Sequence, residues 1–218
     1  MVGRDSPVHF QRMGGYDVDE LPDAGQMASL GASDISHDLR MIAEVRPDVV
    51  LYGCTSATLA HGPGFDATLA RDIEAAAGAR TFTAAGSLVA AIKTLGAKQV
   101  GFSSPYVGEI NDQAVAFIAS HGITTAARAN IGRDLGNYGQ GDLTTDEVFD
   151  LALKADHPKV DAIVLSCTDL RAVEAVARLE AVKGKPVVTS NHAMMFALMR
   201  TLAQPRHAGL PGQPFDLL

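Results

Sequence analysis

The chain contains very little cysteine: Cys54 and Cys167 are the only two thiols in 218 residues. Two isolated cysteines exclude a disulfide-rich scaffold, and they cannot supply the paired ligands of a zinc site. The seven histidines are scattered without the spacing of metal ligands, so we expect no metal. We expect both thiols to stay reduced.

Two further absences restrict where the chain works and what it binds. No run reaches 18 apolar residues, and the first ten residues lack the basic and apolar regions of a secretory signal. We therefore expect a cytoplasmic protein with no membrane partner. The formal net charge is −7 and there is no basic stripe, which argues against a nucleic-acid partner.

Common catalytic and cofactor motifs are also missing. The sequence has no P-loop, no G-x-S-x-G elbow and no H-E-x-x-H helix. The segment GPGFDA at 62–67 formally matches a dinucleotide fingerprint, but it does not directly follow a strand and it contains Pro63. We therefore do not interpret it as a nucleotide site.

Strand-length apolar segments alternate with helical segments along the chain. The predicted strands are near-continuous apolar runs bounded by proline, glycine or charge: PDVVLYG, KQVGFSS, VDAIVLS and KPVVTS, with SPVHFQRM as a less regular candidate. Five segments between them show helical spacing: LARDIEAAAG, AGSLVAAIKTLGA, GEINDQAVAFIASHGI, TTDEVFDLALKA and LRAVEAVARLEAVKG. This alternation predicts an α/β fold with parallel sheets flanked by helices.

The two cysteines occupy the same position in two similar segments. Residues 48–54 read DVVLYGC, residues 161–167 read DAIVLSC, and a threonine follows each cysteine. Each segment continues into a helix and a further short strand, within ARTFTAAGS after the first and KPVVTSNHA after the second. The repeat predicts two related α/β lobes that face each other.

The predicted first lobe comprises residues 1–87 plus 190–218, and the second comprises residues 88–189. Ligands of open α/β sheets bind at the carboxyl ends of the strands, where both cysteines are placed. We therefore expect both thiols in one interlobe cleft. The glycine-rich segment 132–146 is predicted to be a long loop over that cleft.

A thiol between the end of a strand and the start of a helix has a chemical consequence. The positive end of the helix dipole favours thiolate over thiol. Thr55 and Ser56 after the first thiol, and Thr168 after the second, add hydroxyl and backbone donors that could bind a substrate carboxylate. The alternative is that both cysteines pack in the core as small apolar side chains.

Four other residues are candidates for the site or for its surroundings. Tyr106 ends a predicted strand, where its hydroxyl could reach a carboxylate, although a core or surface role is the alternative. His61 and His192 follow elements of the cysteine lobes and could line the cleft. His121 precedes a glycine at a predicted helix end, where a charged imidazole would suit the helix dipole and have a structural role.

In the segments around the two cysteines, GCTSAT and SCTDLR, the sequence resembles the aspartate/glutamate racemase superfamily. The resemblance is strongest to its maleate cis-trans isomerase and arylmalonate decarboxylase branch. The likeness runs from about Val8 to about residue 203. It implies two pseudosymmetric lobes, one catalytic cysteine from each lobe at the cleft, and no metal or organic cofactor.

The resemblance also implies a role for each matching position. In the decarboxylase the first cysteine position is glycine, whereas this chain has Cys54. Maleate isomerases have both cysteines, which implies that Cys54 is the nucleophile and Cys167 its acid or base partner. Tyr106 and Asn137 fall where the family binds a substrate carboxylate.

We therefore expect a cofactor-independent isomerase of a small dicarboxylate that forms a homodimer or a higher homo-oligomer. The alternatives are an arylmalonate decarboxylase-like enzyme, an amino-acid racemase with one thiol on each face of the substrate, and an inactive relative that binds a small acid. The last is motivated by one departure from the family. Family chains normally begin with a strand and a turn carrying a substrate-binding asparagine, which has no counterpart ahead of SPVHFQRM.

Overall fold

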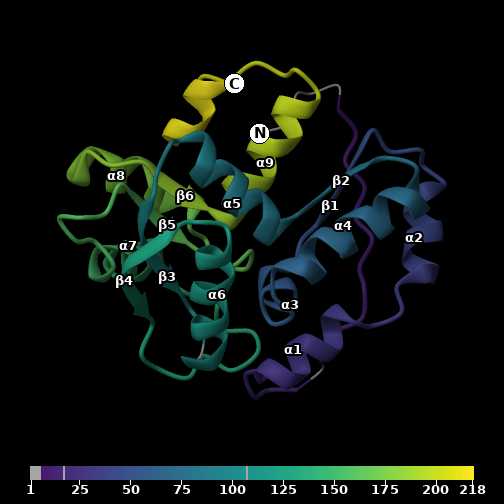
Figure 1. Cartoon of the computed structure of the whole chain (residues 1–218), viewed down its shortest axis with the longest axis horizontal. Helices are drawn as coiled ribbons and strands as arrows, with labels where there is room; N and C mark the ends of the chain where they lie inside the picture. Colours follow the sequence, from purple (N-terminus) through teal and green to yellow (C-terminus); the bar gives the residue numbers. More distant parts are fainter. Residues whose placement is uncertain (1–5, 17, 107) are drawn as a thin grey trace.

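The structure is a computed structural model that describes residues 6–16, 18–106 and 108–218 (Figure 1). The first half of the chain forms α1 (Ala24–Gly31), α2 (Ser36–Ala43), β1 (Val49–Tyr52), α3 (Thr55–Leu59), α4 (Pro63–Ala77), β2 (Arg80–Thr83) and α5 (Ala84–Thr94). The second half forms β3 (Gln99–Ser104), α6 (Gly108–Ser120), β4 (Thr124–Asn130), α7 (Thr145–Lys154), β5 (Ala162–Leu165), α8 (Val173–Lys183), β6 (Val187–Thr189), α9 (Ser190–Thr201) and the 3₁₀ helix η1 (Gln213–Leu217).

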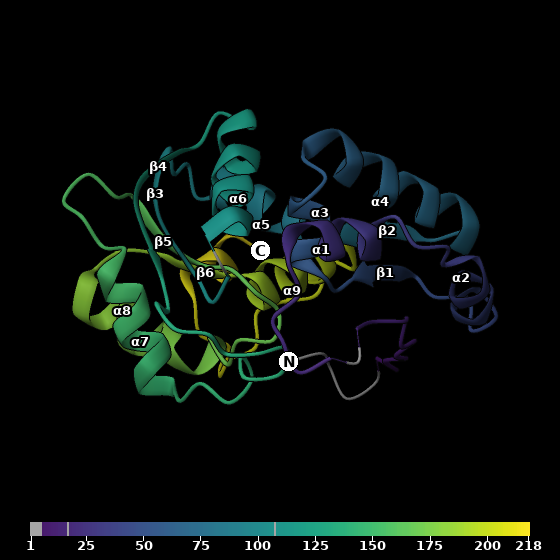
Figure 2. The same ribbon diagram turned by 90° about the horizontal axis from the view of Figure 1, so that it is seen from below.

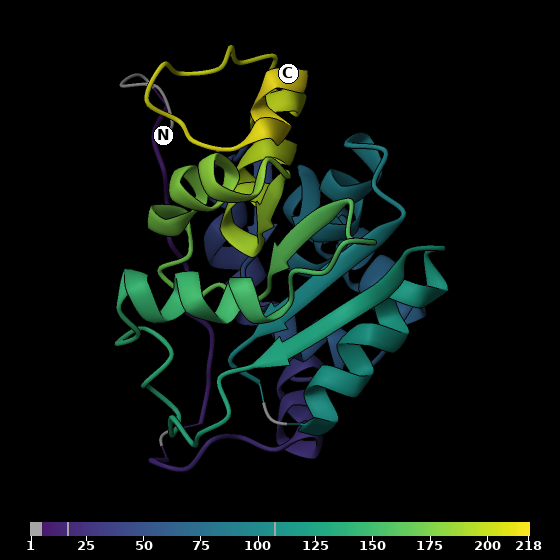
Figure 3. The same ribbon diagram turned by 90° about the vertical axis from the view of Figure 1, so that its left-hand side faces the viewer.

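Within these described residues the strands form two parallel sheets. One sheet pairs β1 with β2, and the other has the order β4-β3-β5-β6. In the larger sheet Phe102 lies opposite Val164, which lies opposite Val188. Figure 3 shows this sheet with α6 on one face and with α7 and α8 on the other. The predicted α/β fold with parallel sheets flanked by helices is confirmed.

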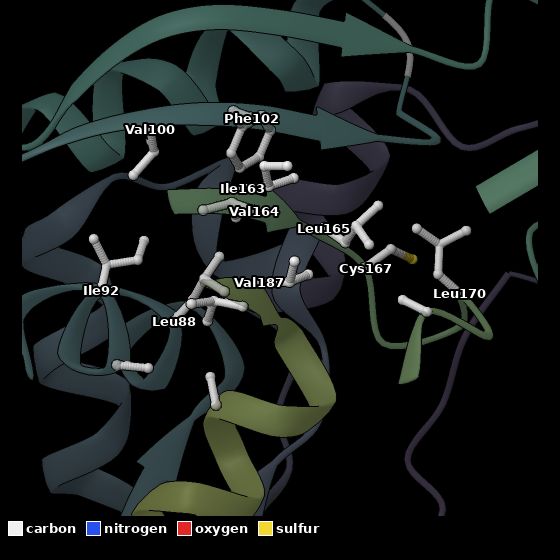
Figure 4. Close-up of a cluster of buried hydrophobic side chains, with 14 of the residues drawn as sticks. Leu88, Ile92, Val100, Phe102, Ile163, Val164, Leu165, Cys167, Leu170 and Val187 are labelled. Atoms are coloured by element: carbon white, nitrogen blue, oxygen red, sulfur yellow. The ribbon is translucent and has the colours of Figure 1, made fainter. Parts of the chain in front are cut away.

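The core lies mainly around the larger sheet. Every residue of β5 is fully buried, which explains its continuous apolar sequence AIVL. Figure 4 shows side chains of β3 and β5 gathered with Leu88 and Ile92 of α5, while Cys167 follows at the edge of the cluster. In contrast, β1 is only half-buried along Val49–Leu51.

Helices α5 and α9 pack against each other between the two sheets (Figures 1 and 2). Each helix directly follows a short strand and is capped by a threonine at that junction. The Thr83 hydroxyl accepts the N–H of Gly86, and the Thr189 hydroxyl accepts the N–H of His192. A strand and then a capped helix therefore follow each cysteine, after α3 and α4 in the first case and after α8 in the second. This order supports two related lobes, whose residue boundaries stay a prediction.

Some segments of the described chain differ from the predicted elements. The strand prediction at SPVHFQRM is wrong, because residues 6–13 are irregular and Phe10 is 93% exposed, without a sheet to cover it. Strand β4 is an edge strand with partly exposed side chains, so it lacks the apolar run that marks the central strands. The short helices α1, α2 and α3 also have no counterpart among the predicted helices.

The glycine-rich segment is a loop as far as the start of α7. A capping box begins that helix: the Thr144 hydroxyl accepts the N–H of Glu147, and the Glu147 carboxylate accepts the N–H of Thr144. Among the described residues, no helix has the length and apolar character that crossing a membrane requires.

Candidate active site

Cys54 lies between the first sheet and a helix start, as the sequence predicts. It follows β1 and is the N-cap residue of α3, with an extended backbone at φ −121° and ψ 107°. Its sulfur lies 3.8 Å from the hydroxyl oxygen of Ser56, in the first turn of the helix. The next residue, Thr55, is buried and accepts the Thr58 hydroxyl on its carbonyl oxygen at 2.9 Å. The sulfur of Cys54 is therefore held at the positive end of a short helix.

Cys167 follows β5 but lies in a different local structure. Helix α8 begins only at Val173, so the expectation of a helix start directly after this thiol is wrong. The φ angle of Cys167 is +138°, in a region that favours glycine. Such a conformation costs about 1–3 kcal/mol and persists only where surrounding contacts enforce it. Strain of this kind is concentrated at functional sites.

Hydrogen bonds join the two cysteine segments. The Thr168 hydroxyl donates to the carbonyl of Gly53 at 2.9 Å, across 115 positions of sequence. The hydroxyl oxygen of Ser190, the first residue of α9, accepts the Cys167 N–H at 3.2 Å and the Thr55 hydroxyl at 3.2 Å. The residues that flank the two thiols therefore meet at one place, where the carboxyl ends of β1 and β5 converge.

Tyr106 belongs to this meeting point. It is buried at 7% exposure, and its hydroxyl lies 3.3 Å from the Ser166 hydroxyl, next to Cys167. Burial raises the pKa of Tyr106 well above its usual value, and the nearby Cys167 and Cys54 raise it further. The phenol therefore stays protonated and is available as a hydrogen-bond donor.

Asn137 is placed differently from the other predicted site residues. Its side-chain amide donates to the carbonyl of Tyr16 at 2.7 Å, and its backbone N–H donates to the carbonyl of Asp19 at 2.9 Å. The adjacent Gly136 has φ +61°, and a Cβ there would lie 2.6 Å from the Asp19 oxygen. Close packing therefore fixes this part of the loop against the segment before α1. The structure does not bring the Asn137 side chain together with the cysteine segments.

Burial dominates the acidity of both thiols. It raises the pKa of Cys54, which the N–H of Ala57 and the hydroxyl of Ser56 lower in part. It raises the pKa of Cys167 to about 12, and the negative charge of Asp169 adds to this effect. The N–H donors at the start of this five-residue helix do favour the thiolate of Cys54, as expected, but desolvation outweighs them and the pKa is raised. Both cysteines rest as neutral, free thiols.

The candidate histidines lie away from the thiol contacts. His192 is fully buried, packs edge-on against Phe215 with ring centroids 5.3 Å apart, and has its pKa lowered to about 4 by burial. His61 stacks on Phe65 and lies 2.5 Å from the carbonyl of Ala28. His121 does follow α6 as predicted, but burial lowers its pKa and therefore disfavours the charged imidazole.

Sequence reasoning did not find four residues that surround the thiols. Ser190 and Asn191 begin α9, and the Asn191 amide donates to the carbonyl of Thr168 at 2.9 Å. Their signal was the polar sequence TSN at the carboxyl end of the strand next to β5. Ser166 directly precedes the second cysteine, and Asp169 follows it by two residues. No described group of three or more histidine, cysteine, aspartate or glutamate side chains is arranged to hold a metal.

Comparison with known proteins identifies the family. A family model described as arylmalonate decarboxylase matches residues 26–215. A maleate isomerase from Nocardia farcinica is 29% identical over 179 residues, which cover 78% of this chain and 69% of that relative. A maleate isomerase from Geobacillus stearothermophilus is 26% identical over 167 residues, which cover 74% of this chain and 66% of that relative. The matched region thus spans about two thirds of each relative's length.

A solved structure shares the fold. A cysteine-to-serine mutant of the Nocardia farcinica maleate cis-trans isomerase, which holds a covalently bound succinylcysteine intermediate, matches with a TM-score of 0.82 at 22% identity. The match covers 90% of this chain and 82% of that chain. Sequence and fold agree with the resemblance carried by the two cysteine segments, and the chain belongs to the arylmalonate decarboxylase family.

Proposed function

We propose that the chain is a cofactor-independent isomerase that converts a small cis-enedioate such as maleate into its trans isomer, with Cys54 and Cys167 as the reacting groups. The observation that carries this proposal is the pair of links between the thiol segments, through Ser190 and through Thr168. These links support a single site with one thiol from each predicted lobe, as a two-thiol reaction requires. The maleate isomerases among the relatives support the choice of substrate class.

The isomerisation needs a temporary single bond between the two alkene carbons. The sulfur of Cys54 bonds to one carbon, and the other carbon takes a proton from Cys167. The proton of Cys54 passes to Cys167, so the sum is addition of one S–H group across the double bond. After rotation about the new single bond the steps reverse: Cys167 returns to Cys54 the proton that it received and takes back the proton on carbon while the bond between carbon and the Cys54 sulfur breaks, so both thiols are regenerated and the trans acid is released.

The resting protonation states suit this sequence. Cys167 is a neutral thiol, with a pKa of about 12 due to its burial, so it carries the proton that the carbon must receive. Cys54 is less buried and has N–H donors and a hydroxyl beside its sulfur, which favour the charge that develops on attack. We therefore assign Cys54 as the nucleophile and Cys167 as the proton donor and acceptor.

The substrate carboxylates bind among the donors around the thiols. Thr55 and Ser56 lie at the start of α3, Thr168 lies beside Cys167, and the protonated phenol of Tyr106 lies near both thiols. Asn137 remains a predicted carboxylate ligand, and it would have to release the carbonyl of Tyr16 to act as one. The interlobe cleft, the cytosolic location and the homo-oligomeric state likewise remain predictions.

Decarboxylation of an arylmalonate is the second candidate. The family model carries that description, and a neutral Cys167 could protonate the carbanion left by loss of carbon dioxide. The presence of Cys54 favours the isomerase, because decarboxylation has no use for a nucleophile at that position.

Turnover of a carboxylate panel tests the proposal. The purified chain is assayed with maleate, phenylmalonate and each enantiomer of aspartate and glutamate, in parallel with Cys54→Ser and Cys167→Ser variants. We expect maleate to give fumarate and both variants to lose activity by orders of magnitude, since a serine hydroxyl is a far weaker acid. Decarboxylation of phenylmalonate that survives in Cys54→Ser would favour the second candidate, and racemisation of an amino acid would exclude both.

A further inference from the structure

Ser190 occupies a central position between the two thiol segments. It is the first residue of α9 and is fully buried. Its hydroxyl oxygen accepts one hydrogen bond from the backbone N–H of Cys167 and one from the side chain of Thr55, both at 3.2 Å. A single oxygen atom therefore connects the turn that carries one thiol with the helix that follows the other.

The conformation of Cys167 explains why such a connection is needed. With φ at +138°, this residue has a backbone conformation that a side chain disfavours. Ser190 accepts the Cys167 N–H and so fixes the peptide group before the strained residue. Asn191 donates to the carbonyl of Thr168 at 2.9 Å and so fixes the chain after it. The first turn of α9 thus holds both sides of the strained residue.

We propose that Ser190 is a positioning residue that holds Cys167 in its strained conformation and at a fixed distance from Cys54. It acts through Cys167 and Thr55 and does not touch the substrate. Its effect on turnover rests on the proposed function, whereas its effect on the Cys167 backbone does not. This inference leaves the class of substrate unchanged, because it concerns only how the relative positions of the two sulfur atoms are fixed.

The chain offers a matched control in Ser87 of α5. Ser87 is buried at 2% exposure, like Ser190, but its hydroxyl has no hydrogen-bond partner within the described part of the chain. Ser87→Ala and Ser190→Ala remove the same atom from two buried helices that pack against each other. Only Ser190→Ala removes bonds to a cysteine segment.

The test measures the reactivity of each thiol separately. Wild type, Ser190→Ala and Ser87→Ala are treated with iodoacetamide at pH 8, and the alkylation rates of Cys54 and Cys167 are followed by peptide mass spectrometry. We expect Ser190→Ala to raise the Cys167 rate about tenfold or more, as one unit of pKa lost through solvent entry would do. The Cys54 rate should change much less, and Ser87→Ala should match wild type at both thiols.

The kinetic arm uses maleate. We expect kcat of Ser190→Ala to fall about 10- to 100-fold with a smaller change in KM, because the reacting sulfur is misplaced while the carboxylate donors remain. If wild type lacks turnover, the proposed function fails while the alkylation arm still decides the role of Ser190. Equal changes in the alkylation rates of both thiols would indicate a general loss of stability and overturn the inference. An alkylation rate of Cys167 in Ser190→Ala equal to that in wild type would also overturn it. If Ser190→Ala does not fold, Ser190→Cys takes its place, because cysteine keeps a similar shape but accepts hydrogen bonds weakly. Ser190→Cys should also raise the alkylation rate of Cys167.

Discussion

The buried thiol of Cys167 makes a quantitative prediction for stability at high pH. Its pKa is about 12 in the folded chain against an ordinary value of 9.0, and its side chain is 7% exposed. Since the folded thiol keeps its proton where the unfolded thiol loses it, the stabilisation is complete below pH 9 and is lost as the pH rises toward 12. At pH 10 ionisation of this thiol shifts the equilibrium toward the unfolded state roughly elevenfold, which lowers the free energy of unfolding by about 1.4 kcal/mol.

The assay compares wild type with Cys167→Ser by urea unfolding at pH 7 and pH 10. Serine does not ionise in this range. Between the two pH values the free energy of unfolding of the variant should therefore fall by about 1.4 kcal/mol less than that of wild type. Cys54 and Tyr106 also have raised pKa values, but they titrate in both proteins and cancel in the double difference. Equal losses in the two proteins would show that Cys167 ionises as an ordinary exposed thiol, and the account of the resting site would be wrong.

Three stability predictions test the fold around the site. Gly101→Ala should lower the free energy of unfolding by about 1–3 kcal/mol, because its Cβ would lie 2.1 Å from the Ala155 carbonyl oxygen. The control Gly64→Ala, with open space around it, should be neutral or stabilising in thermal melts. Equal effects of the two substitutions would contradict the close packing of β3 on α7. Thr83→Val should cost about 1–2 kcal/mol, since it removes both the cap of α5 and a 2.5 Å bond to the buried Asp66, and an unchanged melting temperature would refute that role. Thr144→Ala should cost about 1 kcal/mol by removing the capping box of α7, which urea unfolding would detect, and a change below a few tenths would show that the box contributes little.

The sequence predicted the parts of the fold that are buried on both faces. The segment AIVL of β5 has no polar residue because helices cover both faces of its sheet. Strand β3 is likewise buried from Val100 to Ser104, although it ends on two serines. The exposed elements were not predictable in this way. Strand β4 lies at a sheet edge and has no buried residue, and SPVHFQRM has strand-like composition but no partner strand. Pairing depends on the tertiary neighbours, which local composition does not report.

The sequence pointed to the two candidate cysteines, but it did not reveal the residues that connect their segments. The repeated frame of residues 48–54 and 161–167 identified both cysteines because it marks equivalent strand ends. Ser190 lies 23 positions after Cys167 and 135 after Thr55, so its contacts depend on how α9 packs. The acidity of the thiols was also beyond the sequence, because burial sets it and only the packed structure determines burial.

Trapping the covalent adduct tests the two-thiol reaction most directly. Cys167→Ser is incubated with maleate, digested and analysed by mass spectrometry, with Cys54→Ser as the control. During a long incubation water can supply the proton that completes the adduct, whereas rapid reversal needs Cys167 as the proton acceptor. The peptide containing Cys54 should therefore gain the mass of one maleic acid, and the control should gain none. Fumarate formation by wild type with no adduct on Cys54 in the variant, or an adduct that persists in Cys54→Ser, would contradict the account.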